Sequence, residues 1–212
     1  MSRLRIAFFV SGNGTLFESL ATRCQSGELN ADPALLVSSS AKAAALERAQ
    51  RLSVPSVVLR LSEFASERAF SDALLKLLSE HRINFICLAG YLTLIPPAVV
   101  AAFRNRMLNI HPALLPAFGG PGMYGHRVHE AIIESGARIS GATVHLVDDK
   151  YDHGPIVLQR AVFVRADDTA DTLAERVHVI EHDLYADAVR LFADNRIEIA
   201  DRHIRILPGK RA

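Results

Sequence analysis

The sequence predicts an α/β fold with a mostly parallel central sheet and helices on both faces. Three observations lead to this prediction: short apolar runs alternate with segments of helical periodicity, turn residues separate them, and the alternation recurs along the N-terminal part of the chain. Such strand–helix repeats form parallel sheets with right-handed connections. The chain has 212 residues, half of them apolar, and is expected to fold as a single domain over residues 1–212.

The expected elements follow one another at short intervals. A strand over Leu4–Val10, a turn over Ser11–Thr15 and a helix over Leu16–Cys24 form the first unit. Two further units have strands and helices over Ala34–Val37, Lys42–Arg51, Ser56–Leu59 and Glu63–Glu80. A buried strand, a short helix and another short strand are then expected over Phe85–Ala89, Pro97–Phe103 and Met107–Ile110.

A loop rich in glycine, Ala117–Gly125, opens the C-terminal half, and loops of this length and composition often act as lids. A helix and two strands are expected after it, over His129–Ser135, Ala142–Val147 and Ile156–Val164. The last element is a long amphipathic helix, for which Thr172 and Glu175 match a capping box. Only a short tail is expected after Leu191, with frayed residues over Pro208–Ala212.

The charge balance argues against several classes of partner. Lys and Arg number 24 and Asp and Glu 23, so the formal net charge is +1. Without a strong field of one sign, neither nucleic acid nor an anionic membrane surface is expected as a partner. The uncharged stretch from Ile83 to Phe103 is interrupted by Pro96 and Pro97, so no membrane span is expected there.

Two patterns of potential metal ligands are set aside. Cys24 and Cys87 lack the spacing of a zinc site or a disulfide framework, which favours the reducing cytoplasm. The run His178–His182 matches the HxxEH pattern of some zinc proteases, but no convincing third ligand follows it. No metal is therefore expected.

The turn between the first strand and the first helix is a candidate anion site. Gly12 and Gly14 leave backbone N–H groups accessible, and a helix N-terminus attracts negative charge. A dinucleotide is disfavoured, because Phe17 replaces the third glycine of GxGxxG and Asp32 precedes the second strand instead of ending it. A tight turn that needs positive φ would explain the same glycines, so a structural interpretation also stays open.

Asn109 and His111 alternate at the end of a short strand, so their side chains project from the same face beside the glycine-rich loop. An amide can donate to a developing oxyanion, and an imidazole can donate a hydrogen bond or move a proton near neutral pH. This pair suits acyl chemistry, although a lone histidine at a strand end is more often structural. Asp152, in a polar loop between later strands, could orient His111 and stabilise its protonated form.

Five motifs occur in an order and spacing that resemble the glycinamide ribonucleotide formyltransferase family: SGNGT, LAGYLTLIP, NIHPALLP, GATVHLVDDKYDHGP and TLAERVHVIEH. The NIHPxLLP core is also shared with other folate-dependent formyltransferases and with formyltetrahydrofolate deformylase. The resemblance spans most of the chain and implies a Rossmann-like formyltransferase fold. It implies an enzyme that moves the formyl group of 10-formyltetrahydrofolate to the amine of glycinamide ribonucleotide in purine synthesis.

The resemblance also assigns site residues by position. It makes Asn109, His111 and Asp152 catalytic, with His111 as the proton donor and Asp152 raising its pKa. The phosphate of the ribonucleotide is expected to bind in the N-terminal half, at Gly14, Thr15 and Leu16. The rest of the ribonucleotide is expected to contact the last helix, at His178, Val179, Ile180 and Glu181. The folate is expected mainly along backbone groups at Leu92, Thr93, Leu94, Ile95, Asn109, Asp148, Asp149, Lys150, Tyr151 and Asp152. The C-terminal half is therefore expected to bind folate and to carry catalysis.

The chain departs from the family pattern at three places. Thr93 stands where the family commonly has a basic residue. Direct counting places Glu67 where the family has an arginine that contacts folate. Arg68 takes that position, and becomes a folate-binding candidate, only if the correspondence shifts by one residue. The loop GGPGMYGHRVHE is longer than in some members, which leaves the roles of His126, Arg127 and His129 open; a lid over the phosphate is one option.

Three alternatives are weighed against this function. A formyltetrahydrofolate deformylase would use water in place of the amine, and that family usually has an additional N-terminal domain. A methionyl-tRNA formyltransferase normally has a C-terminal tRNA-binding domain, which does not fit the short expected tail. A non-catalytic folate-binding module is disfavoured by the presence of all three catalytic positions. The sequence leaves the oligomeric state open, with a homodimer among the options.

Overall fold

The computed structural model describes residues 3–209. The chain divides into two compact units after Leu108. The expectation of a single domain over 1–212 stays a prediction, and the end of the expected frayed tail, residues 210–212, lies outside the described residues. Within residues 3–209, no helix has the length and apolarity that a membrane span requires.

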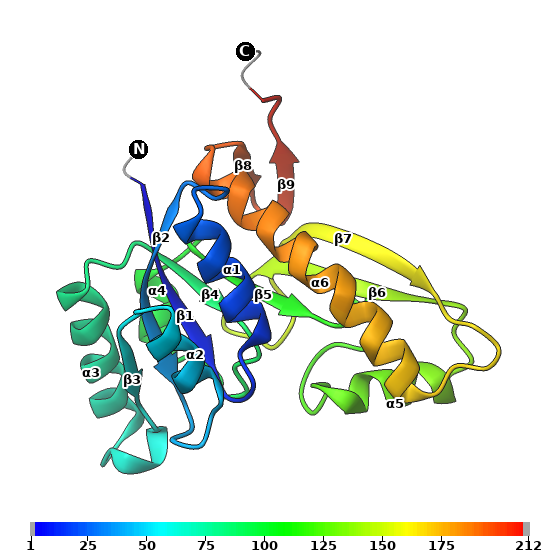
Figure 1. The fold of residues 1–212 in the computed structure, drawn as a ribbon, viewed down its shortest axis with the longest axis horizontal. Helices are drawn as coiled ribbons and strands as arrows, with labels where there is room; N and C mark the ends of the chain where they lie inside the picture. The colour runs from blue at the N-terminus through cyan, green and yellow to red at the C-terminus, as the bar shows by residue number, and fades with distance from the viewer. Residues whose placement is uncertain (1–2, 210–212) are drawn as a thin grey trace. The chain divides into compact units, whose positions relative to one another are not determined.

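The first unit is built on a parallel sheet (Figure 1). Its strands are β1 (Leu4–Val10), β2 (Ala31–Ser38), β3 (Ser56–Val58), β4 (Phe85–Leu88) and the start of β5 (Met107–His111). β1 pairs in parallel with both β2 and β4, and β2 pairs with β3, so the order is β3-β2-β1-β4, with β5 next to β4. Residues Ile6–Val10 are completely buried, as expected for a strand covered on both faces.

The helices of the first unit follow from the order of its strands. They are α1 (Thr15–Gln25), α2 (Ala45–Arg51), the short 3-10 turn η1 (Leu61–Glu63), α3 (Glu67–Glu80) and α4 (Pro97–Ala102). Helix α1 contacts α2, and α3 contacts α4. The crossovers through α1 and α2 run in one direction along the sheet and the crossover through α3 returns, so right-handed connections place the two pairs on opposite faces. The predicted α/β class, with helices on both faces, is confirmed.

The second unit combines three strands of a mixed sheet with two packed helices (Figure 1). Strands β5, β6 (Ile139–Leu146) and β7 (Ile156–Phe163) follow in that order, and β6 and β7 are antiparallel. Helices α5 (His126–Glu134) and α6 (Ala170–Ala193) contact each other, and α6 also packs on β6 and β7. A two-stranded hairpin of β8 (Ile197–Ala200) and β9 (His203–Ile206) completes the unit.

Three predicted helices begin three or more residues away from the expected start, among them α2, which was expected from Lys42 and begins at Ala45. The helix expected over Glu63–Glu80 is interrupted, because the Ser66 hydroxyl accepts a hydrogen bond from Ala69 N (3.1 Å) and caps a helix that begins at Glu67. Helix α5 begins at His126 rather than His129, after a glycine that adopts φ 53°.

The sequence prediction was wrong at three further places. Asp32 lies inside β2 and pairs with Arg5 (2.5 Å) instead of preceding the strand. The capping box of α6 joins Thr169 and Thr172, because Thr169 has the extended backbone of an N-cap and Thr172 is the third residue of the helix. The segment after Leu191 is not merely a tail: it contains the β8–β9 hairpin.

Candidate functional site

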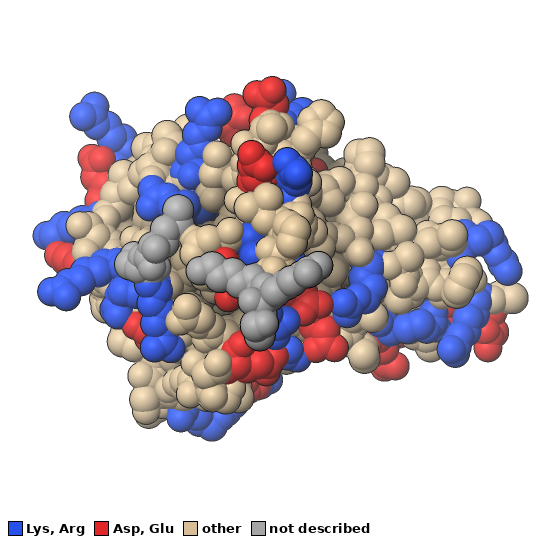
Figure 2. All heavy atoms as spheres, turned by 90° about the horizontal axis from the view of Figure 1, so that it is seen from above, with Lys and Arg blue, Asp and Glu red and all other residues tan. Residues whose placement is uncertain are grey.

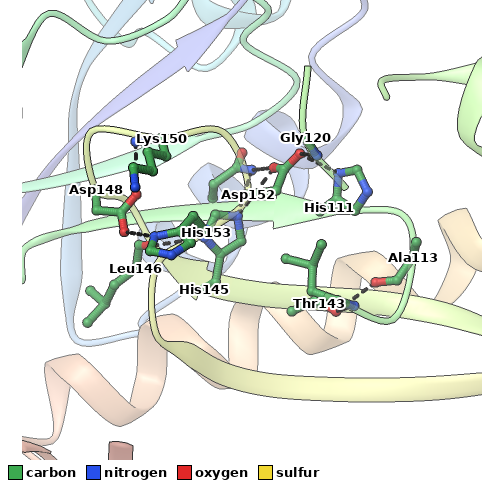
Figure 3. Close-up of polar contacts among 12 residues, drawn as sticks. His111, Ala113, Gly120, Thr143, His145, Leu146, Asp148, Lys150, Asp152 and His153 are labelled. Atoms are coloured by element: carbon green, nitrogen blue, oxygen red, sulfur yellow. Dashed lines mark hydrogen bonds and ion pairs between the residues drawn. The ribbon is translucent and has the colours of Figure 1, made fainter. Parts of the chain in front are cut away.

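The three predicted catalytic residues come together in the second unit, and Figure 3 shows two of them, His111 and Asp152. Asn109 and His111 lie at the end of β5, and the His111 side chain is only 4% exposed. Asp152 comes from the loop between β6 and β7. Its Oδ2 atom lies 3.5 Å from His111 Nδ1, and its Oδ1 atom accepts a hydrogen bond of 3.4 Å from Asn109 Nδ2. An amide, an imidazole and a carboxylate therefore form one buried cluster.

The loop that carries Asp152 is shaped by its own polar groups. The Asp148 carboxylate accepts hydrogen bonds from Lys150 N (3.0 Å) and His153 Nδ1 (2.7 Å; Figure 3). At Gly154 the chain returns so close to β6 that a Cβ atom would lie 1.8 Å from the Leu146 carbonyl oxygen. Between these two constraints, Asp152 adopts a left-handed backbone with φ 51°.

The glycine-rich loop contacts the cluster through its backbone. His111 Nε2 donates to the Phe118 carbonyl oxygen (2.7 Å), and Gly120 N donates to Asp152 Oδ2 (2.9 Å). A Cβ atom at Gly119 would lie 3.2 Å from the Asp152 Cβ atom and 2.5 Å from the Leu115 side chain, so this approach requires glycine. The predicted lid loop is therefore in direct contact with two catalytic candidates.

His145, on β6, is a site residue that the sequence analysis missed. Its Nδ1 atom lies 2.8 Å from the Leu146 carbonyl oxygen, which can only accept, so the proton of the neutral ring is on Nδ1. Nε2 is then the acceptor for the Asn109 amide at 3.1 Å, and it lies 3.6 Å from Asp152 Oδ1. One sequence signal could have identified His145. It lies two residues after Thr143, so both side chains project from the same face of a strand that leads into the loop of Asp152.

Thr143 holds the chain just after His111. Its hydroxyl donates to the Ala113 carbonyl oxygen (2.6 Å; Figure 3) and accepts from Leu115 N (3.0 Å). Gln159 Nε2 donates to the same hydroxyl and to the Leu115 carbonyl oxygen, both at 2.9 Å. These buried bonds fix the exit of β5 and with it the direction of His111.

Burial dominates the pKa of His111. Desolvation lowers it below the ordinary histidine value, while the Asp152 charge acts in the opposite, raising direction. The effect expected of Asp152 is therefore present, but burial outweighs it. The Asp152 carboxyl is itself buried, which would raise its pKa, yet the His111 charge and the hydrogen bond from Gly120 N act in the opposite direction, and its pKa lies below the usual range.

A second group of polar side chains lies on α6. Glu181 has a side chain only 10% exposed, and its Oε2 atom accepts from His178 Nδ1 (3.0 Å), which raises the pKa of His178. His178 Nε2 is 3.2 Å from His182 Nε2. Val179 faces outward with 71% exposure, so the four predicted positions from His178 to Glu181 are not equivalent.

The Glu181 charge also reaches two buried imidazoles on other elements. It acts to raise the pKa of His111 on β5 and of His129 on α5. Burial has the larger effect on His129 and lowers its pKa, and its Nδ1 atom has no hydrogen-bond partner among the described residues. The candidate ribonucleotide residue Glu181 and the candidate catalytic residue His111 therefore belong to one electrostatic environment.

In the first unit, the predicted phosphate turn leads directly into α1. Gly14 is the N-cap with φ 71°, and a Cβ atom there would lie 2.4 Å from Ala45 Cβ, so the turn requires glycine for structural reasons. Backbone N–H groups of a first helical turn have no partner within the helix. Glu18, the acidic residue of this turn, is neutralised by ion pairs with Arg48 and Arg51, which removes a repulsive charge from an anion site.

The predicted folate segment of the first unit follows β4. Leu92 and Leu94 are exposed, at 55% and 44%, whereas Ile95 is buried. Two outward-facing leucines so close together offer an apolar surface to a ligand. Arg68 lies on α3 with a side chain 92% exposed, and its ion-pair contact among the described residues is Asp72 at 4.0 Å.

Residues 4–189 match the protein family described as formyl transferase. The chain belongs to the formyl transferase family. Two relatives named phosphoribosylglycinamide formyltransferase come from Arabidopsis thaliana, where it is called chloroplastic, and from Bacillus subtilis. The Arabidopsis protein is 41% identical over 99% of this chain and 72% of its own length. The Bacillus protein is 36% identical over 92% of this chain and 99% of its own length.

A solved structure agrees with the family assignment. The glycinamide ribonucleotide transformylase 1 of Symbiobacterium toebii is 38% identical and matches with a TM-score of 0.92, over 97% of this chain and 95% of that one. In this member of the formyl transferase family, no group of three or more His, Cys, Asp or Glu side chains within residues 3–209 could hold a metal ion. Figure 2 shows acidic and basic side chains interspersed over one face rather than collected by sign.

Proposed function

We propose that this chain is an enzyme that transfers the formyl group of 10-formyltetrahydrofolate to the amine of glycinamide ribonucleotide, in purine biosynthesis. The observation that carries the proposal is the buried cluster of Asn109, His111 and Asp152. The two relatives named phosphoribosylglycinamide formyltransferase supply the acceptor, and the resemblance of the motifs to folate-dependent formyltransferases supplies the formyl donor.

The first step is attack of the neutral amine on the formyl carbon. The new C–N bond forms, and the carbonyl electron pair moves onto the oxygen to give a tetrahedral oxyanion. One Asn109 N–H, now in a long bond of 3.4 Å to Asp152, turns to this oxygen. His111 Nε2–H is the second donor, and the oxyanion replaces the Phe118 carbonyl oxygen as its acceptor.

The second step breaks the bond between the formyl carbon and the folate nitrogen. The attacking nitrogen loses a proton and the leaving nitrogen gains one, directly or through water, so no covalent enzyme intermediate is needed. When His111 is protonated, the Asp152 carboxylate, 3.5 Å from Nδ1, stabilises its positive charge, and Nε2–H is then a stronger donor to the oxyanion. His145 keeps the Asn109 amide turned with its N–H groups toward the reacting centre.

The substrate-binding residues remain proposals. The ribonucleotide phosphate binds to the backbone at Gly14, Thr15 and Leu16, and Glu181 accepts hydrogen bonds from a hydroxyl or amine of the same substrate. The folate lies along Leu92–Ile95 and the loop Asp148–Asp152, and Arg68 is a more remote candidate because of its exposed position. This assigns phosphate binding to the N-terminal half of one domain and folate binding with catalysis to the C-terminal half.

An assay with three outcomes tests the function. Consumption of 10-formyltetrahydrofolate is followed spectroscopically with and without glycinamide ribonucleotide, and the products are identified by mass. Turnover that requires the ribonucleotide and gives the formylated ribonucleotide supports the proposal. Release of formate without the ribonucleotide would identify a deformylase, and binding without turnover would identify a folate-binding module.

Assembly and location are proposed separately. We propose a homodimer, for which the cross-strand pair Ile139 and Phe163, 52% and 79% exposed, offers an apolar surface that a second copy would cover. Sedimentation equilibrium measures this directly. We propose a cytoplasmic location, in keeping with two buried free cysteines, one of which, Cys24, has its pKa raised to about 12 by burial.

A further inference from the structure

The order of the strands in the first unit reverses direction at β1. From β1 the chain proceeds to β2 and β3 on one side, and it returns to β4 and β5 on the other. Ligands of open α/β sheets bind at the carboxyl ends of the strands that flank such a point. Here these strands are β1 and β4, which pair in parallel.

Ser11 is the first residue after β1, and it bridges this point by two hydrogen bonds. Its backbone N–H donates to the Gly90 carbonyl oxygen (3.0 Å), and its hydroxyl oxygen accepts from Leu92 N (3.0 Å). Gly90 and Leu92 lie just after β4, and Leu92 begins the proposed folate segment. The Ser11 side chain therefore holds the start of one proposed substrate segment while its backbone begins the other.

The Ser11 hydroxyl is held in turn by the neighbouring strand. Its oxygen lies 2.6 Å from the Ser39 hydroxyl, just after β2, and Ser39 N donates to the Val10 carbonyl oxygen (3.0 Å). The carboxyl ends of β2, β1 and β4 are thus joined through one side chain. Because Ser39 and Leu92 both hold the Ser11 hydroxyl, the Ser11 side chain has little rotational freedom. The backbone of Leu92 therefore cannot shift on its own while this hydrogen bond is kept.

The phosphate turn on the other side of Ser11 is fixed as well. Ala45 N donates to the Gly12 carbonyl oxygen (3.3 Å), and Arg48 Nε donates to the Asn13 carbonyl oxygen (2.8 Å). A ligand that adds its own hydrogen bonds to the N–H groups of this turn restricts the turn further, and the Ser11 hydroxyl connects that restriction to the backbone of Leu92.

We propose that Ser11 is a positioning residue that couples the binding of the two substrates, by transmitting the order of the phosphate turn to the folate segment. The inference rests on the proposed function. It predicts that ribonucleotide binding tightens folate binding and that the Ser11 hydroxyl carries part of this effect. The side chain itself contacts neither substrate.

The test is binding of tetrahydrofolate, the reaction product, measured by calorimetry with and without saturating glycinamide ribonucleotide. In the unaltered protein the ribonucleotide lowers the dissociation constant. In Ser11→Ala the ratio of the dissociation constants measured without and with the ribonucleotide falls toward one. The KM for 10-formyltetrahydrofolate rises about threefold to tenfold, the range expected for loss of one hydrogen bond. The value of kcat changes less than the KM, because the catalytic side chains are intact.

Two matched variants separate positioning from general loss of structure. Ser11→Thr keeps a hydroxyl and restores the ratio. Ser40→Ala removes a nearby hydroxyl that accepts from Lys42 N (3.2 Å) in the adjoining loop, and it leaves both ratio and KM unchanged. Both variants and Ser11→Ala are compared by thermal unfolding before the binding measurements.

The outcomes distinguish this inference from the proposed function. If the unaltered protein does not formylate the ribonucleotide, the proposed function fails. If it does, but the ratio is one in the unaltered protein or is the same in Ser11→Ala, the coupling role is overturned. A change of equal size in Ser40→Ala would also overturn it.

Discussion

The proposed catalytic cluster and the proposed phosphate turn would recognise their targets by different means. In the cluster, side chains of Asn109, His111 and Asp152 are withdrawn from water and bonded to one another or to nearby backbone. In the turn from Gly12 to Leu16, the groups offered to a ligand are backbone N–H groups. The turn depends on a position without a side chain, because Gly14 has positive φ and no room for a Cβ atom. The cluster depends on functional groups, whereas the turn depends on conformation.

The two regions are therefore expected to control different kinetic parameters. Deleting a functional group in the cluster removes an interaction that strengthens as charge develops, so it lowers kcat. Disturbing the turn removes an interaction that is equal in the ground and transition states, so it raises the KM of the ribonucleotide.

The largest effect is expected for His111→Ala. Loss of the Nε2 donor and of the charge that Asp152 stabilises should reduce kcat by about 10² to 10⁴. The ribonucleotide KM should change by less than about threefold, because uniform binding is unaffected. Steady-state formyl transfer measures both, with Asn109→Ala and Asp152→Ala as companions. Near-normal kcat in all three variants would remove the cluster from the mechanism.

A smaller loss of kcat is expected for His145→Ala. Without the acceptor at 3.1 Å, the Asn109 amide is free to rotate, and misplacement of a catalytic donor can cost up to about 10² in rate. His145→Gln retains an acceptor and should recover part of the activity. If the glutamine variant is no better than alanine, or if only the KM values change, His145 does not position Asn109.

Gly14→Ala should act in the opposite way, on binding. Its φ of 71° and the contact with Ala45 predict a loss of about 1–3 kcal/mol in stability and a rise of about tenfold in ribonucleotide KM, equivalent to about 1.4 kcal/mol. Gly27→Ala is the matched control, since Gly27 also has positive φ, 83°, but open space around it. It should lose stability without a change in KM. Equal KM effects in both variants would argue against a binding role for the turn.

Stability should decrease on acidification from neutral pH. The pKa of His111 is lowered by burial, so below the ordinary value of about 6.5 the unfolded chain binds a proton that the folded chain does not. The stabilisation present above that pH is lost as the pH falls toward the folded-state pKa. Urea unfolding at several pH values from about 7 to 5 should show this slope, and His111→Phe should reduce it. His129, whose pKa is also lowered, sustains the remainder.

The smallest effect is expected for Lys150→Ala. The backbone N–H of Lys150 bonds to Asp148, while its side chain is exposed. Contacts to folate through backbone groups tolerate a changed side chain, so the KM for 10-formyltetrahydrofolate should change by less than about twofold. A larger rise would mean that this loop, like the catalytic cluster, acts through its side chains.

Much of the fold could be predicted because its signals are local. The apolar run Leu4–Val10 has the composition of a strand buried on both faces, and its predicted bounds are those of β1. The β8–β9 hairpin escaped prediction because its strands have only four residues each, too few for their alternation to stand out from the surrounding chain. The break before Glu67 escaped because Phe64 continues the helical spacing, and only the hydroxyl of Ser66 reveals the cap.

The α/β class and the candidates Asn109, His111 and Asp152 follow from the sequence, because strand alternation and motif spacing can be recognised along one chain. Three relations are visible only after folding: His145 supports Asn109, the backbone of Phe118 and Gly120 holds His111 and Asp152, and burial outweighs Asp152 in the pKa of His111. These are relations between segments far apart in sequence. Hydrogen bonds and desolvation depend on distances in space, and those distances arise only when the strands and loops have packed.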